Sequence, residues 1–141
     1  MGCGGGVRFR GRRRCGRGAG ACGGRCVDRR HGTGWVSYGT TAAARGRGVA
    51  SGGCCAVAAW AFEDAGLFRL ELGRRVDNRA SCAVARAAGF AVEGIQRRRL
   101  GYDGVRYDVE LHARLATDPE SAVARTAEAG GGGPGRSPPA P

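Results

Sequence analysis

One glycine-rich segment constrains the fold of this chain more than any other, Arg45-Gly46-Arg47-Gly48-Val49-Ala50. It lies between a short extended run at residues 35–41 and an apolar run with helical spacing that continues to about residue 64. Glycines within such a turn let the backbone approach a ligand without interference from a Cβ atom. The helix that follows offers unpaired N–H groups at the positive end of its macrodipole. The sequence therefore predicts an anion site, suited to a phosphate, at residues 45–50.

Two familiar phosphate loops do not fit this segment. A dinucleotide-binding fingerprint would require a third glycine at the position of Ser51, and a P-loop would require a Lys-Ser/Thr pair that is absent. The spacing instead follows the pattern Arg/Gln-x-x-Gly-x-Gly/Ala, with Arg45 first, Gly48 fourth and Ala50 sixth. An arginine-rich turn without a ligand is the alternative interpretation of the segment.

The remaining patterns predict a short alternation of helices and strands. A helix over 48–64 is followed by Gly66, and leucines at 67, 70 and 72 indicate a strand. Asn78 is expected to cap a helix over 79–88 that ends at Gly89. Asp103-Gly104 is a strong hairpin signal between two alternating runs. In the second run, apolar residues alternate with polar ones from 105 to 115, which is typical of a half-buried strand.

Three further segments carry a family resemblance: WAFEDAGL at 60–67, DNRAS at 77–81 and GFAVEG at 89–94. With them, the run from residue 35 to residue 115 resembles the C-terminal half of a RimJ/RimL-type GNAT N-acetyltransferase. The resemblance implies a partial GNAT fold, an α/β mixed sheet with two helices that lacks the N-terminal lobe. It also implies an enzyme that transfers an acetyl group from acetyl-CoA to a primary amine. The acceptor would be the N-terminus of a ribosomal protein or a small-molecule amine.

The resemblance assigns coenzyme-binding roles to one loop and one asparagine. Backbone N–H groups of the segment 46–50 would hold the pyrophosphate, with Arg45 or Arg47 adding positive charge. Asn78 matches the family asparagine that hydrogen-bonds the pantetheine arm, a role compatible with capping the helix. A backbone N–H group between Ser37 and Thr41 would polarise the thioester carbonyl.

Proton handling is where this sequence departs from the family pattern. Ala85 stands where many GNAT enzymes place a tyrosine, and Trp35 stands where relatives often carry an acidic residue. Ser81 is then the candidate that protonates the leaving thiolate, and Glu93 is the candidate general base. Packing or a local cap is the alternative role for Ser81, and a solvated turn the alternative for Glu93. His112 is expected to face outward or to be hydrogen-bonded within the sheet.

Composition divides the chain into three predicted segments. Residues 1–33 are mostly glycine and arginine with almost no apolar periodicity, which predicts a disordered segment. Residues 34–118 are predicted to form the truncated acetyltransferase domain. Residues 119–141 end in a glycine- and proline-rich sequence and are predicted to be irregular.

Charge leaves two alternative functions open. The formal net charge is +11, and all 23 Lys or Arg residues are arginine. A basic, glycine-rich arm is typical of nucleic-acid binding through phosphates, but Phe9 is its only aromatic residue for base stacking. Specific nucleic-acid binding is therefore not expected, although an arginine/glycine-rich nucleic-acid binder remains an alternative. A coenzyme A-binding fragment without turnover, or a homodimer, is also compatible with the sequence.

The seven cysteines do not suggest a metal site or a disulfide framework, because no C-x-x-C pair occurs and the total is odd. Cys54, Cys55 and Cys82 fall on predicted helices, where buried thiols behave as small hydrophobic groups. No apolar run approaches the roughly 20 residues that span a bilayer. We therefore expect a soluble, cytoplasmic protein that needs no metal.

Overall fold

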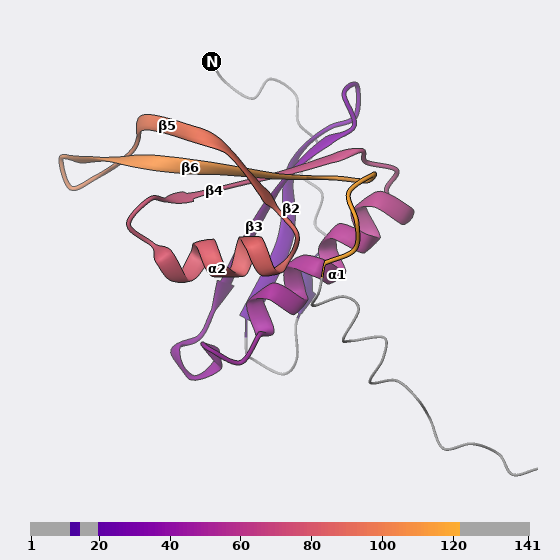
Figure 1. Ribbon diagram of the computed structural model, residues 1–141, viewed down its shortest axis with the longest axis horizontal. Helices are drawn as coiled ribbons and strands as arrows, with labels where there is room; N and C mark the ends of the chain where they lie inside the picture. The colour runs from indigo at the N-terminus through magenta and orange to yellow at the C-terminus, as the bar shows by residue number, and fades with distance from the viewer. Residues whose placement is uncertain (1–11, 15–19, 122–141) are drawn as a thin grey trace, which may run out of the picture.

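The computed structural model describes residues 12–14 and 20–121. Their strands form one six-stranded sheet with the order β1-β2-β3-β4-β6-β5 (Figure 1). Strands β3 and β4 are parallel and are joined through helix α1, whereas every other neighbouring pair is antiparallel. The predicted mixed α/β sheet with two helices is therefore confirmed. The elements in chain order are β1 (Arg12–Arg14), β2 (Gly20–Asp28), β3 (Thr33–Thr40), the 3-10 helix η1 (Ala42–Ala44), α1 (Val49–Glu63), β4 (Arg69–Arg75), α2 (Arg79–Ala87), β5 (Ala91–Tyr102) and β6 (Val105–Leu115).

Both α-helices pack on the same face of the sheet and form one core with it (Figure 1). Burial alternates strictly along β4, so that Leu70 and Leu72 point toward the helices. The buried residues that meet them from β3, α1 and the α2 region are Val36, Cys54, Cys55, Val57, Ala58, Ala61, Ala85, Ala88 and Phe90. No helix that the structure describes is long and apolar enough to cross a membrane.

Local signals set the ends of the helices and the hairpin where the sequence predicts them. Helix α1 begins directly after Gly48, and Gly66 follows its end with a positive φ of 66°. The hairpin between β5 and β6 turns at Asp103 and Gly104, whose φ angles are 49° and 77°. A two-residue turn with positive φ at both positions matches the right-handed twist of the strands that it joins.

The prediction that residues 1–33 are irregular is wrong for the part that the structure describes. Strand β2 pairs with β3 from the Gly20–Thr40 pair to the Asp28–Thr33 pair, and β1 pairs with β2 in turn. Backbone hydrogen bonds hold such a strand, and these require no periodicity of side chains. Val27 also packs against the core. Residues 1–11 and 15–19 lie outside the described residues.

The boundary predicted at residue 118 also differs from the structure. The side chain of Ser121 is buried, and its Oγ lies 3.1 Å from the Sγ of Cys55 on α1. The chain beyond β6 therefore continues to pack against the helical layer at least as far as residue 121. The rest of the predicted irregular tail, residues 122–141, lies outside the described residues.

Strand β6 turns a polar face toward the helices, which the sequence did not predict. His112 pairs with Leu72 and is fully buried, and Glu110 pairs with Arg74 on the same face. The outward orientation considered for His112 is therefore wrong, and its alternative, a hydrogen bond, is confirmed by the contact between its Nε2 and Arg74. The apolar residues of the alternating pattern lie on the other face, where Val109 approaches Gly73.

Candidate functional site

Strands β3 and β4 are paired over only part of their length. Their parallel register runs from the Thr33–Arg69 pair to the Trp35–Glu71 pair, although β3 continues to Thr40 and β4 to Arg75. The backbone of residues 36–40 consequently has no β4 partner on that side. The splayed segment expected near residues 37–41 is thus present, and it leaves backbone groups open toward a molecule inserted between the strands.

The glycine-rich loop enters helix α1 through two residues with left-handed backbone conformations. Gly46 has a φ of 70° and Gly48, the N-cap, has a φ of 72° and a ψ of 4°. Such angles are accessible to glycine without penalty and cost other residues roughly 1–2 kcal/mol. The first-turn N–H groups of a helix have no partner within the helix. Ser51 Oγ donates to the Gly48 carbonyl oxygen at 3.0 Å, and the N-cap Gly48 has no side chain that could accept from those N–H groups.

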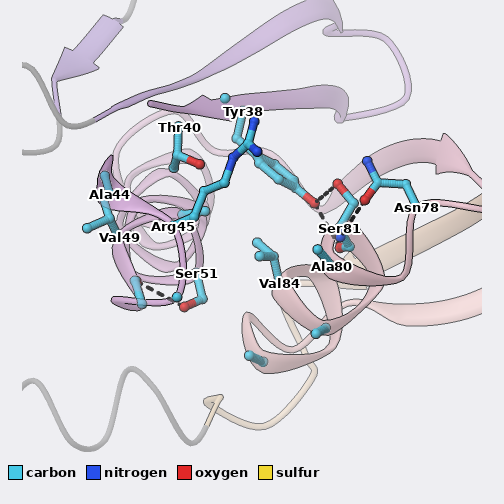
Figure 2. A pocket seen from close by; sticks show the side chains of 16 residues that line it. Tyr38, Thr40, Ala44, Arg45, Val49, Ser51, Asn78, Ala80, Ser81 and Val84 are labelled. Atoms are coloured by element: carbon cyan, nitrogen blue, oxygen red, sulfur yellow. Dashed lines mark hydrogen bonds between the residues drawn. The ribbon is translucent and has the colours of Figure 1, made fainter. Parts of the chain in front are cut away.

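A pocket of about 710 Å³ opens between this loop, the end of β3 and helix α2 (Figure 2). Among the predicted site residues, it brings together all except Arg47 and Glu93. The lining residues are Tyr38, Gly39, Thr40, Ala44, Arg45, Gly46, Gly48, Val49, Ala50, Ser51, Asn78, Ala80, Ser81, Ala83, Val84 and Ala87. One cavity therefore has an anion-binding helix end at one side and hydroxyl and amide groups at the other.

Helix α2 presents its first turn to the pocket because Asn78 caps it. The Oδ1 atom of Asn78 accepts a hydrogen bond from the Ser81 backbone N–H at 3.1 Å, as the sequence predicts. Tyr38, which the sequence reasoning missed, reaches Ser81 from β3. Its hydroxyl lies 2.9 Å from both the carbonyl oxygen and the Oγ of Ser81 (Figure 2). The alternation of β3 contained a signal, because Tyr38 lies two positions after buried Val36 and shares its face.

Glu93 lies apart from this pocket. It is in strand β5 beside an irregularity in the pairing with β6, and not in a turn as the sequence suggested. Two nitrogens of Arg69 bind its carboxylate, and a third binds Glu71. Arg69 precedes buried Leu70, so this group lies on the sheet face opposite to the helices. The hydrogen bonds from Arg69 hold the pKa of the Glu93 carboxyl below its usual value, which makes it a weaker base.

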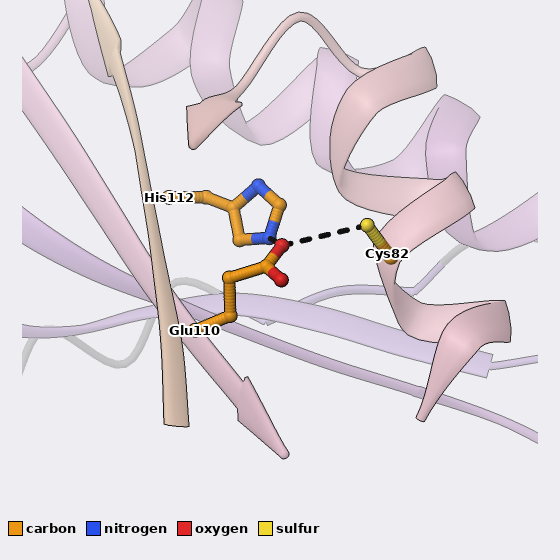
Figure 3. Close-up of side chains that lie close together, drawn as sticks. All are labelled: Cys82, Glu110 and His112. Atoms are coloured by element: carbon orange, nitrogen blue, oxygen red, sulfur yellow. Dashed lines mark hydrogen bonds and ion pairs between the residues drawn. The ribbon is translucent and has the colours of Figure 1, made fainter. Parts of the chain in front are cut away.

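A second polar cluster lies beneath α2, where Cys82, Glu110 and His112 place three metal-ligand atoms within 4.8 Å of one another (Figure 3). Arg74 already binds two of these residues, with its Nε 3.1 Å from His112 Nε2 and one terminal nitrogen 2.6 Å from Glu110 Oε1. A divalent cation would have to share this space with the guanidinium charge. The set therefore fits a buried ion pair better than a metal site.

Arg74 also connects that cluster with the pocket. Its second terminal nitrogen donates to the carbonyl oxygens of Arg75 at 3.1 Å and Asn78 at 2.9 Å. The side chain of Arg74 is 6% exposed, and that of its partner Glu110 is 14% exposed. The pKa of the Glu110 carboxyl is lowered, first by the hydrogen bond from Arg74. The loop that carries Asn78 is thus fastened to the sheet by a largely buried charge pair.

The sequence of this chain also matches a known protein family. Residues 3–91 match the family described as "Acetyltransferase (GNAT) domain". The match begins well before residue 34 and so includes β1 and β2. The chain is also 33% identical over 88 residues to the probable N-acetyltransferase YjcK of Bacillus subtilis, a region that covers 62% of this chain and 49% of that protein.

Solved structures show the same arrangement of elements. RimJ of Mycobacterium smegmatis, in complex with CoA-disulfide, aligns with a TM-score of 0.72 and 30% identity over 79% of this chain and 55% of that one. The microcin C7 self-immunity acetyltransferase MccE, in complex with acetyl-CoA and AMP, aligns with a TM-score of 0.62 and 26% identity over 69% of this chain and 54% of that one. This chain spans about half the length of the proteins that it matches. RimJ and MccE, two different acetyltransferases, both align well with this chain, so the alignments support the GNAT family and no single subtype within it.

Proposed function

Because the chain belongs to the GNAT acetyltransferase family, we propose that it binds acetyl-CoA in the pocket between α1 and α2 and transfers the acetyl group to a primary amine. The observation that carries this proposal is the meeting of a glycine loop, an open helix N-terminus and a splayed strand pair in one cavity. The acceptor class, a protein N-terminus or a small-molecule amine, is part of the proposal. A RimJ/RimL subtype, a homodimer and a cytoplasmic location stay predictions.

The pyrophosphate would lie against the backbone N–H groups of residues 46–50. Gly46 and Gly48 both have a positive φ and line the pocket, and a Cβ atom at Gly46 would meet nothing within 4 Å. The site is therefore roomy and carries positive potential from the helix end. Arg45 lines the pocket and adds a full charge. Arg47 is exposed and does not line it, so we assign Arg47 at most a long-range electrostatic effect.

The pantetheine arm would extend from this loop along the unpaired side of β3. Residues 36–40 offer backbone N–H and carbonyl groups there, and Asn78 faces them from the start of α2. An N–H group at this position would polarise the thioester carbonyl. The capping bond uses only the side-chain oxygen Oδ1 of Asn78, so the side-chain N–H groups can donate to the arm.

The reaction itself exchanges one bond for another. The amine nitrogen attacks the thioester carbonyl carbon, a nitrogen–carbon bond forms, and the carbon–sulfur bond breaks to release a thiolate. One proton leaves the nitrogen and one reaches the sulfur, so atoms and charge balance over the whole reaction. Ser81 lines the pocket and is the residue we propose to face the sulfur. Glu93 is across the sheet, so its role as general base has no support from its position.

The test is calorimetric titration of the full chain with acetyl-CoA, together with an acetylation assay on model amines. Gly48→Val places a β-branched side chain at a left-handed position beside the proposed pyrophosphate, and we expect it to abolish binding. Gly52→Ala is the matched control, because Gly52 is on the same helix, does not line the pocket, and a Cβ there meets nothing within 4 Å. Equal affinity of wild type and Gly48→Val would refute the site. Binding without acetylation would identify a coenzyme-binding fragment.

A further inference from the structure

Tyr38 makes a long-range contact that family resemblance alone did not suggest. It belongs to β3, and its ring extends across the pocket to helix α2, 43 residues further along the chain (Figure 2). The hydroxyl lies 2.9 Å from the carbonyl oxygen of Ser81 and 2.9 Å from its Oγ. Because Asn78 holds the backbone N–H of the same serine, Ser81 is fixed from two sides.

The two hydroxyls share a limited number of protons. A phenol and a serine hydroxyl each have one proton to donate, whereas the carbonyl oxygen of Ser81 can only accept. When Tyr38 donates to that carbonyl, Ser81 can donate to the phenol oxygen. When Tyr38 instead donates to the serine Oγ, the serine proton is left to point into the pocket. Rotation of two hydroxyl groups, without movement of the backbone, therefore presents one donor to whatever lies there.

We infer that Tyr38 is a positioning residue, which orients the Ser81 hydroxyl so that it donates a hydrogen bond to the sulfur of the departing coenzyme A thiolate. The inference rests on the proposed function, because it requires the coenzyme sulfur to lie beside the first turn of α2. It explains how a site with Ala85 and Trp35 at the family's usual acid and base positions stabilises the leaving group. The hydrogen bond stabilises the thiolate until the sulfur takes up its proton, and it requires no further reactant.

A hydrogen bond to a charged form favours that form, so the pair should lower the pKa of the bound coenzyme thiol. Bonds to charged groups are worth roughly tenfold or more in an equilibrium, which corresponds to a shift of about one pKa unit. A phenol that only packed against the helix would not move this value. The pKa of the bound thiol is therefore a readout that separates positioning from structure.

The experiment titrates the thiolate absorbance of coenzyme A bound to the full chain, from about pH 6 to pH 10. Tyr38→Phe keeps the ring and removes the hydroxyl, and it should raise the bound thiol pKa by about one unit. Ser81→Ala should raise it at least as much, and the double variant should match Ser81→Ala alone, because Tyr38 acts through Ser81. Tyr107→Phe, a tyrosine stacked beside Arg75 and outside the pocket lining, is the control and should leave the value unchanged.

Two results would overturn the inference directly. The first is a bound thiol pKa in Tyr38→Phe equal to that of wild type. The second is a double variant whose shift equals the sum of the two single shifts, which would make the residues independent. If Tyr38→Phe does not fold, the Ser81→Ala variant, in which β3 is unchanged, decides the question alone. An unchanged pKa of the bound thiol in that variant counts against the pair. Failure of wild type to bind coenzyme A would overturn the proposed function as well, whereas normal binding with unshifted thiol pKa values in the variants removes only the roles of Tyr38 and Ser81 at the sulfur.

Discussion

The substitution Glu110→Gln tests whether the charge pair beneath α2 stabilises the fold. Arg74 and Glu110 are 6% and 14% exposed, and their closest atoms are 2.6 Å apart. Removing one partner of a fully buried pair costs about 3–5 kcal/mol, because the other charge is left uncompensated. Glutamine keeps the volume and an acceptor oxygen, and Glu110 retains some contact with water. We therefore expect a loss of about 2 kcal/mol in the free energy of unfolding, equivalent to about 10 °C in Tm.

The pH dependence of this loss has a defined sign. The hydrogen bond from Arg74 holds the pKa of Glu110 below its usual value in the folded protein. A carboxyl of this kind contributes stability above its unfolded-state pKa of about 4.3, and the contribution disappears as the pH falls through the lower folded-state value. The stability gap between wild type and Glu110→Gln should be constant near neutral pH and should narrow below about pH 4.

Urea denaturation from neutral to acidic pH measures the gap directly. Glu63→Gln is the control, because Glu63 is an exposed glutamate at the end of α1, and it should stay within about 0.5 kcal/mol of wild type. A double-mutant cycle with Arg74→Met and Glu110→Leu should give a coupling above about 1 kcal/mol. A Glu110→Gln variant as stable as wild type, with no coupling in the cycle, would refute the pair as a stabilising element.

Three further outcomes follow from the geometry. Asn78→Ala removes the cap of α2 and should cost about 1 kcal/mol of stability and weaken acetyl-CoA binding, whereas Asn78→Ser should keep the cap; equal melting temperatures for both variants would contradict the capping role. Gly73→Ala places a Cβ 2.9 Å from the Cγ1 of Val109 and should cost about 1–3 kcal/mol in denaturant melts; a variant as stable as wild type would contradict the close packing there. Glu93→Gln should change turnover by less than about twofold, because Arg69 holds that carboxylate across the sheet; a loss of 10²–10⁴-fold would restore it as general base.

The parts of the fold that were predicted correctly from the sequence depend on residues that are close together along the chain. The turn at Asp103 and Gly104 and the start of α1 at Gly48 each follow from backbone angles that few other residues adopt. Strand β2 could not be predicted, because its glycine-rich sequence carries no alternating side-chain pattern. Backbone hydrogen bonds to β3 hold this segment in the sheet. Pairing with the next strand along the chain overrides local composition there.

The site shows the same division. The loop residues and Asn78 were predicted to bind the coenzyme, because their motifs are local in the sequence, and all of them except Arg47 line the pocket. The contact between Tyr38 and Ser81 joins residues 43 apart, and only the packing of α2 against β3 brings them together. The inward face of β6 was misjudged because polar and apolar residues alternate, and a period of two does not say which set faces the helices. Arg74 resolves that choice by pairing with Glu110.

The central claim is that the N–H groups at the start of α1 hold the coenzyme pyrophosphate. NMR titration of the ¹⁵N-labelled chain with acetyl-CoA tests it residue by residue. Saturable shifts should concentrate at the amides of Gly46, Gly48 and Ala50, while the amides of the far hairpin turn, Asp103 and Gly104, remain unchanged. Saturable binding that leaves the loop amides in place and shifts another surface would contradict the account.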